Sequence, residues 1–264
     1  MKFLRAVSGV SWMTFRSLGT GKRIWTAAVL LLAPAAVALA GTAGKGAQAG
    51  PVFQSVVFNL SLGFGVYVLA LVYGLSMTSG EIEEGTAGYL YLGALPKWLI
   101  VLVQIVVTWG VLTALLSVGL LLTALASLPA GGDLPRLGRD VAGCALAGSA
   151  GLLVSLSFYA SCGLVFRSPT SALAAAIVPT FFWEFLVTQW PLRFAAWTVT
   201  NNMRALLLPL LFEGRRVSLY NYVRNFRLHD YGEATMFLSV LAGLFLSAAM
   251  VAAMNRSIEG KEAR

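Results

Sequence analysis

The uncharged apolar stretch from Trp98 to Leu128 constrains the fold of this chain more than any other feature. A helix needs about 20 apolar residues to cross the hydrocarbon core of a bilayer, and a longer one tilts or protrudes. Further long apolar runs recur along the chain. Because these runs are continuous and do not alternate with polar residues, they exclude a transmembrane β-barrel. The sequence therefore predicts an all-α membrane protein.

Composition points to the same class. Charged residues make up 11% of the 264 residues, whereas a soluble globular domain has about 25%. The net charge of +8 at pH 7 does not indicate a nucleic-acid partner. The basic residues lie at the ends of the apolar runs, where they set topology or contact anionic lipid. The expected environment is the lipid bilayer.

The apolar runs predict six transmembrane helices in a single domain over residues 1–264, at 24–40, 52–77, 98–128, 141–166, 170–189 and 234–254. The first of these is expected to be retained and not cleaved as a signal peptide. Residues 1–23 predict an amphipathic helix at the cytoplasmic interface. Its expected apolar face is formed by Phe3, Leu4, Val7, Val10, Ser11, Thr14, Phe15 and Leu18.

The distribution of basic residues predicts that both termini are cytoplasmic. The short segments expected on that side contain Lys2, Arg5, Arg16, Lys22, Arg23, Lys97, Arg167, Arg256, Lys261 and Arg264. The short loops on the opposite side contain Lys45, Arg136 and Arg139. The extracytoplasmic loop 190–233 contains further arginines, but long loops follow the positive-inside rule poorly.

The connection 79–97 contains the densest acidic cluster of the chain. Its three acids are Glu81, Glu83 and Glu84. Thr78 and Glu81 form a capping-box pattern, and acids suit a helix N-terminus because the helix dipole favours negative charge there. Apolar and aromatic residues including Tyr89 follow, and Pro96 ends the run. We interpret this connection as a short helix that docks a cytoplasmic partner; the alternative is a solvated loop.

The segment "MTSGEIEEGTAGYLYLGALPKWLIVLVQ" resembles the first cytoplasmic loop of ATP-binding-cassette (ABC) permeases of the type-2 export class. The matching positions are Glu81, Glu83, Glu84, Gly85, Thr86, Leu90, Leu95, Pro96 and Lys97. In that family the loop is the coupling helix, which sits in a cleft of the nucleotide-binding subunit. The most similar subgroup is the small permeases that work with a separate ATPase, such as the one serving nitrous-oxide reductase maturation.

The resemblance implies a set of partners and a location. It implies ABC ATPase subunits that hold ATP and Mg²⁺, and a second permease copy in a homodimer or heterodimer. It is also compatible with a periplasmic or extracellular accessory protein. The implied location is the cytoplasmic (inner) membrane of a bacterium or archaeon. The sequence contains no phosphate-binding Gly-x-x-x-x-Gly-Lys-Ser/Thr motif. We therefore expect a transport subunit with no cofactor and no catalytic residue of its own.

Glu184 is the only acid well inside a predicted span. An intramembrane carboxylate is a functional candidate by default. With Arg193 and Arg204 from the following loop it forms our set of substrate or gating candidates; the alternative is a structural pair between Glu184 and an arginine. The same loop contains an apolar run around Pro209 that is too short to span and predicts a re-entrant or interfacial piece.

Three further features have limited meaning. Cys144 and Cys162 fall in one predicted span, roughly 27 Å apart along a helix, which is too far for a disulfide. His229 is the single histidine, so a metal site is not expected. The row formed by Gly143, Ala147 and Gly151 predicts close helix packing, either inside the chain or at a dimer seam.

Two other functions remain open from the sequence. A secondary transporter would use charges near mid-membrane, and Glu184 is the candidate for that role. A membrane anchor would bind a cytoplasmic partner through 79–97 and transport nothing. A response to a proton gradient without ATP would identify the first, and partner binding without nucleotide-dependent transport would identify the second.

Overall fold

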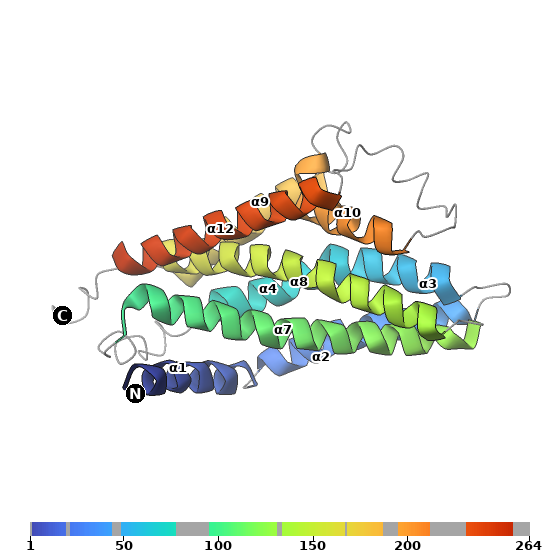
Figure 1. Ribbon diagram of the computed structural model, residues 1–264, viewed down its shortest axis with the longest axis horizontal. Coiled ribbons are helices and arrows are strands. Elements are labelled where there is room, and N and C mark those ends of the chain that lie inside the picture. Colours follow the sequence, from blue (N-terminus) through green and yellow to red (C-terminus); the bar gives the residue numbers. More distant parts are fainter. Residues whose placement is uncertain are drawn as a thin grey trace.

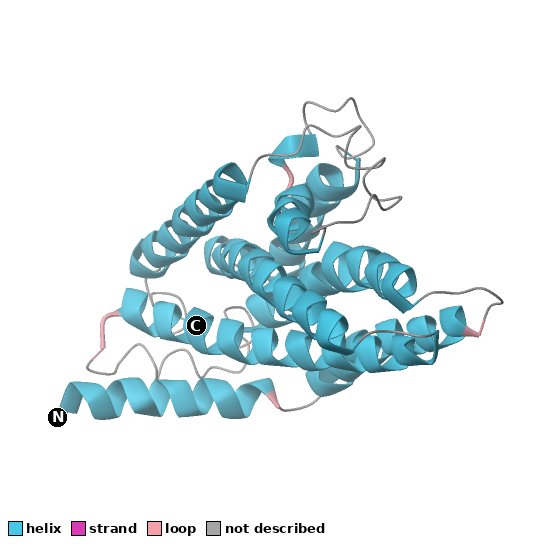
Figure 2. Ribbon diagram, turned by 45° about the vertical axis from the view of Figure 1, so that its right-hand side comes forward, coloured by secondary structure: helices cyan, strands magenta, loops and turns pink. Residues whose placement is uncertain are grey.

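The computed structural model describes residues 2–19, 22–43, 49–77, 95–130, 134–166, 168–186, 195–211 and 231–255. Within these residues all regular structure is helical (Figure 1, Figure 2). The α-helices are α1 (Lys2–Leu18), α2 (Lys22–Thr42), α3 (Ala49–Val56), α4 (Val66–Leu75), α7 (Lys97–Ser127), α8 (Leu134–Val165), α9 (Pro169–Thr180), α10 (Val199–Leu211) and α12 (Tyr231–Asn255). Shorter π or 3₁₀ segments are η1 (Val57–Gly65), η3 (Leu128–Ala130), η4 (Phe181–Leu186) and η6 (Ala195–Trp197).

Among the described helices, 5 are long and apolar enough to cross a membrane. They span Arg23–Thr42, Val52–Leu75, Lys97–Ser127, Pro135–Val165 and Gly232–Asn255. The second consists of α3, η1 and α4 in direct succession. The prediction of an all-α protein with several membrane-spanning helices is confirmed at this level.

The remaining predicted span is 170–189. Its described part, residues 170–186, forms two shorter pieces, α9 and η4, and is not among those five. α9 begins at Pro169, directly after Ser168, whose hydroxyl oxygen accepts a hydrogen bond from the Ser171 N–H. Serine before proline is a typical helix start. Pro179 has no N–H to donate to the helix, and the π-helical segment η4 follows at Phe181.

The boundaries of α7 follow from its flanking residues. Pro96 precedes the helix in an extended conformation and cannot continue a helix from the segment before it. After Lys97, α7 contains no charged residue up to its end at Ser127. The predicted range of 98–128 therefore differs from the observed helix, Lys97–Ser127, by one residue at each end.

α8 begins at Leu134, earlier than the predicted start of the fourth span at Val141. Arg136 and Arg139, which we assigned to a loop, therefore lie on this helix. Hydropathy locates the apolar part of a helix, whereas helical hydrogen bonding continues through charged residues that have good helix propensity. Asp140 lies in this first part of α8 and is buried.

α8 is the central element of the bundle. It packs against α4, α7, α9, α10 and α12. Gly143, Ala147 and Gly151 are buried along one face of it, and a Cβ added at Gly151 would overlap the Sδ atom of Met203 on α10. Glycine therefore lets α8 and α10 approach each other closely. The small-residue row serves packing inside the chain, which favours that reading over a dimer seam.

α1 lies along the edge of the bundle beside α7 (Figure 1, Figure 2). Val10 of α1 forms a small buried cluster with Leu95, which precedes α7, and Ile100, in the first turn of α7. Thr14 and Leu18 on the same face are also buried. Phe15 was predicted on this face, but it is 55% exposed and stacks on Trp12. The side of α1 away from α7 is thus aromatic, as expected for a helix in the membrane interface.

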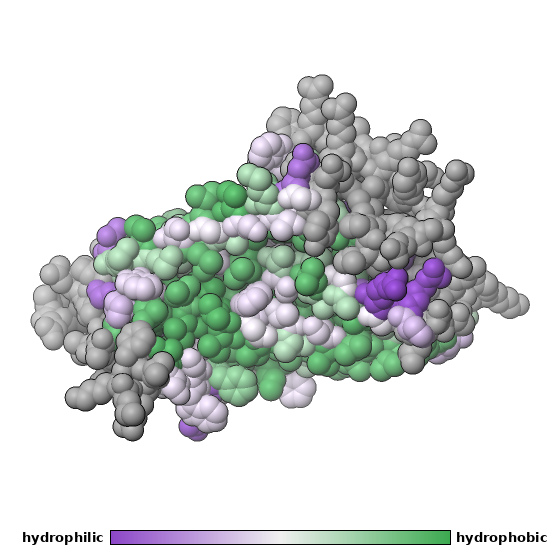
Figure 3. All heavy atoms as spheres, viewed as in Figure 1, coloured by the Kyte–Doolittle hydropathy of each residue, from purple (hydrophilic) through white to green (hydrophobic). Residues whose placement is uncertain are grey.

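Large hydrophobic side chains remain exposed on α2, α7, α9, η4 and α12. Figure 3 shows hydrophobic residues over much of the described face of the bundle. Soluble monomers rarely expose contiguous apolar patches larger than a few hundred Å². The exposed apolar surface therefore fits contact with lipid chains.

Candidate functional site

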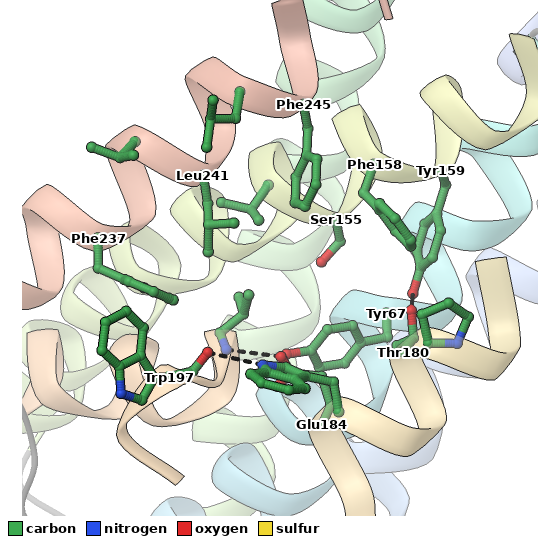
Figure 4. Close-up of a pocket in the computed structure, with 16 residues that line it drawn as sticks. Tyr67, Ser155, Phe158, Tyr159, Thr180, Glu184, Trp197, Phe237, Leu241 and Phe245 are labelled. Atoms are coloured by element: carbon green, nitrogen blue, oxygen red, sulfur yellow. Dashed lines mark hydrogen bonds between the residues drawn. The ribbon is translucent and has the colours of Figure 1, made fainter. Parts of the chain in front are cut away.

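The candidate site is a cavity of about 530 Å³ between α8, α12, the α9 and η4 segment, and the start of α10. α9 and α12 each pack against α8. Within the described residues, contacts between α9 and α12 are few at most. The two helices thus pack on α8 but lie apart from each other, and the cavity fills the space between them (Figure 4).

The walls of the cavity are mainly aromatic and aliphatic. From α12, Phe237, Leu241 and Phe245 point into the cavity from one side (Figure 4). The aromatic rings on the remaining walls belong to Tyr67, Phe158, Tyr159, Trp183 and Trp197. Such a lining, with few polar groups, is typical of sites for small apolar or amphipathic molecules.

The cavity opens toward the apolar outer surface of the bundle. Val240 and Leu244 on α12 line the cavity and are also exposed. On the opposite side of the opening, Trp183 lines the cavity and is partly exposed as well. Since α12 is one of the helices apolar enough to span a membrane, this opening faces the region that lipid chains would occupy.

The main polar group of the cavity is the carboxylate of Glu184 on η4, which is only 7% exposed. The Val199 N–H donates to Oε1 at 2.8 Å, and the Thr200 N–H donates to Oε2 at 3.0 Å. These are the first two backbone N–H groups of α10. Helix N-termini leave such donors without intrahelical partners and attract negative charge. Glu184 therefore caps α10 from a different helix.

Two hydroxyl groups of the described residues also donate to Glu184. The Tyr67 hydroxyl donates to Oε2 at 2.6 Å, and the Thr200 hydroxyl donates to the same oxygen at 2.9 Å. Tyr67 lies on α4 and Thr200 on α10. The carboxylate thus connects α4, η4 and α10 through buried hydrogen bonds, which hold the wall of the cavity together.

Two neighbouring contacts support the same wall. The indole N–H of Trp183 donates to the carbonyl oxygen of Trp197 at 3.0 Å and joins η4 to η6. The Tyr159 hydroxyl donates to Oγ1 of Thr180 at 3.0 Å and joins α8 to α9. With the contacts of Glu184, they bring segments distant in sequence into one site.

Arginine does not pair with Glu184 in the described part of the chain. Arg204 lies partly buried on α10, with no ion pair to Glu184. Arg193 lies outside the described residues. Among the described residues, a helix N-terminus and two hydroxyls contact the carboxylate, in place of the arginine that the structural alternative predicted. The short apolar run around Pro209 forms part of α10.

The acidic loop is mostly outside the described residues. The loop residues outside the described part are Glu81, Glu83, Glu84, Gly85, Thr86, Tyr89 and Leu90. His229, in the loop that precedes α12, also lies outside the described residues. Leu95 and Pro96 are described: Leu95 is buried against α1, and Pro96 precedes α7. The two cysteines are free and buried, so the prediction of two unbridged thiols is confirmed.

Sequence reasoning missed Tyr67, Thr200 and the cavity itself. Tyr67 is one aromatic residue among many in apolar helices, and nothing in its neighbourhood marks it. Thr198 to Asn202 form a polar stretch before an apolar run, which is a typical helix-start signal. That signal could have located the N-terminus of α10, but not the carboxylate that caps it.

Comparison with models of known protein families and with curated protein sequences finds no match. The fold and the site define the class of the protein by themselves. It is a multi-pass α-helical membrane protein with a largely apolar cavity between its helices.

Proposed function

We propose that this chain is the transmembrane permease subunit of an ABC exporter. A separate ATPase subunit would bind the acidic segment 79–97, and two permease copies would assemble around it. The proposal rests on the sequence resemblance in that segment, and on the arrangement of the helices from which the segment emerges.

One observation carries the proposal. The C-terminal end of α4 and the N-terminal end of α7, which flank the acidic segment, lie at the same end of the bundle as α1 and the C-terminal end of α12 (Figure 1). Leu95 at the end of the segment is buried against Val10 of α1. This supports a docking surface at one membrane face, with the amphipathic helix beside it.

The proposed topology has six spans, with α9 and η4 together forming the fifth. Arg16, Arg23 and Lys97 lie near the end that contains α1, whereas Arg136 and Arg139 lie at the start of α8. By the positive-inside rule this distribution supports a cytoplasmic location for the α1 end. The membrane would be the cytoplasmic membrane of a bacterium or archaeon.

The described contacts suggest how ATPase motion would reach the cavity. A displaced coupling segment would move Leu95 and the start of α7. α7 packs on α8 and α12, which form two walls of the cavity. Rigid helices that shift against one another are a common means of alternating access.

The test is co-purification from the native host. Glu81, Glu83 and Glu84 are replaced together by alanine, and Glu233→Ala, an acidic position on α12 outside the segment, serves as the control. We expect an ATPase to co-purify with wild type and the control and to be lost from the triple variant. After reconstitution, ATP hydrolysis by the pair should also depend on the segment. An absence of any ATPase from the wild-type preparation would refute the proposal.

The gradient-driven transporter is the second candidate because Glu184 is a buried carboxylate beside a cavity. Its four hydrogen-bond donors hold it as the cap of α10, which supports a structural role in this conformation. Substrate uptake driven by a proton gradient in the absence of ATP would favour this second function over the first.

A further inference from the structure

We infer that the cavity binds a cationic amphiphile that reaches it from the bilayer, with the apolar part between the aromatic walls and the cationic group beside Glu184. This inference deepens the proposed function, on which it rests for the statement that the amphiphile is the cargo. The binding itself belongs to this chain alone and can be measured without an ATPase.

The size and lining of the cavity fit an apolar chain. Its volume of about 530 Å³ lies within the range of roughly 300–1,000 Å³ that is typical of small-molecule sites. The rings of Phe158 and Phe245 pack against each other with centroids 5.0 Å apart. The ring of Phe237 meets Trp197 edge to face at 5.9 Å, and Trp183, which precedes Glu184 in the chain, donates a hydrogen bond to the Trp197 carbonyl oxygen. A chain in this space would contact rings on several sides.

The route of access is lateral. The opening between α12 and η4 is bordered by exposed apolar side chains, among them Val240, Leu244 and Trp183. A molecule that is already dissolved in the bilayer could pass between them without crossing a polar barrier. A water-soluble ion or sugar would have to cross apolar surface to enter by this route.

The charge of the Glu184 carboxylate favours a cationic group at the polar end of the ligand. The carboxylate of Glu184 is the acidic group of the cavity lining, and no basic side chain of the described residues contacts it. Its Oε1 atom accepts one hydrogen bond, from the Val199 N–H, which leaves acceptor capacity for a ligand.

The aromatic rings reinforce this selection. The faces of tryptophan and tyrosine rings attract organic cations, most strongly when the site is desolvated. Trp183 and Tyr67 lie next to the carboxylate in the same cavity wall. An anionic headgroup would meet like charge in an apolar surrounding, which is unfavourable.

The test uses the full-length protein in nanodiscs of zwitterionic phospholipid. The probe is radiolabelled dodecyltrimethylammonium, with dodecanol and laurate as neutral and anionic competitors of equal chain length. Val240→Trp would narrow the opening. Val251→Trp is its matched control, since it lies on the same helix, is exposed to a similar degree (49% against 51%) and does not line the cavity.

We expect saturable binding of the cationic probe by wild type, with competition by dodecanol and laurate about tenfold weaker than by the unlabelled probe. Val240→Trp should weaken binding about tenfold, and Val251→Trp should leave it unchanged. Glu184→Gln should abolish the preference for the cation. If Glu184→Gln does not fold, the competition measured on wild type and the comparison of the two tryptophan variants still test whether the cavity binds the cation.

Three results would overturn the inference: non-saturable binding, equal competition by all the amphiphiles, or equal effects of the two tryptophan variants. The first and third would show partition into lipid, and the second would show an apolar cavity without charge selection. Each outcome is independent of the ATPase experiment. Cation binding without a co-purifying ATPase would refute only the exporter proposal. A co-purifying ATPase without selective cation binding would refute only the ligand class.

Discussion

Replacing Glu184 by alanine is expected to destabilise the protein by roughly 2–4 kcal/mol. The side chain is buried and accepts hydrogen bonds from the Val199 N–H, the Thr200 N–H, and two hydroxyls. Hydrogen bonds inside membrane proteins contribute on average about 0.6 kcal/mol each, and a buried donor left without an acceptor costs about 1–3 kcal/mol. Two of the four donors are backbone groups that no rotamer change can redirect.

Thiol reactivity provides the assay. Cys144 and Cys162 are free and buried, so a thiol-reactive fluorophore reports unfolding of the detergent-solubilised protein during heating. The apparent Tm of Glu184→Ala should fall by roughly 5–15 °C. Tyr67→Phe removes the contacts of one hydroxyl and leaves the backbone donors of α10 on the carboxylate, so it should lower Tm by much less.

A double variant tests the reasoning behind the magnitude. Once Glu184 is alanine, the Tyr67 hydroxyl has lost its contact with the carboxylate and keeps its contact with the Thr200 hydroxyl. Tyr67→Phe should therefore add little in that background. If Glu184→Ala lowers Tm no more than Tyr67→Phe, or if the two effects are additive, the carboxylate does not act as the cap of α10 and the reasoning fails.

Three further predictions follow from the packing of the described helices. Gly151→Ala should cost about 1–3 kcal/mol because its Cβ would overlap Met203, and Met203→Ala should restore part of the loss, measured by the same Tm assay; no rescue would refute this contact. In folded protein, maleimide should label Cys144 and Cys162 slowly, and in SDS rapidly, as followed by mass spectrometry; rapid native labelling would contradict their burial. Val10→Asp should release α1 from α7 and increase hydrogen exchange in α1 about tenfold or more; unchanged protection would show that the cluster does not hold α1.

Sequence patterns were sufficient for the class and the approximate positions of most helices. The long apolar runs require transmembrane helices because lipid leaves backbone groups no partner outside the segment. Terminal signals such as Pro96 before α7 and Ser168 before α9 act locally, so they can be read directly from the sequence. The start of α8 was predicted too late because charged residues end an apolar run without ending a helix.

The sequence also marked Glu184 as unusual, since an acid in an apolar run has a cost that some contact must offset. It could not supply the contact. An arginine was the natural expectation from charge alone. Only the tertiary structure brings Tyr67 and Thr200 beside this carboxylate, at separations of 117 and 16 residues along the chain.

The sequence by itself determined three properties: the membrane environment of this protein, the helical state of its spanning segments, and the separation of its two cysteines along one helix. Each depends on composition and on contacts within one segment. The tertiary structure alone decided which helices diverge and which approach. The cavity exists because α9 and α12 pack on α8 and little on each other. That arrangement depends on side-chain shapes across several helices, such as Gly151 against Met203, and no local pattern encodes it.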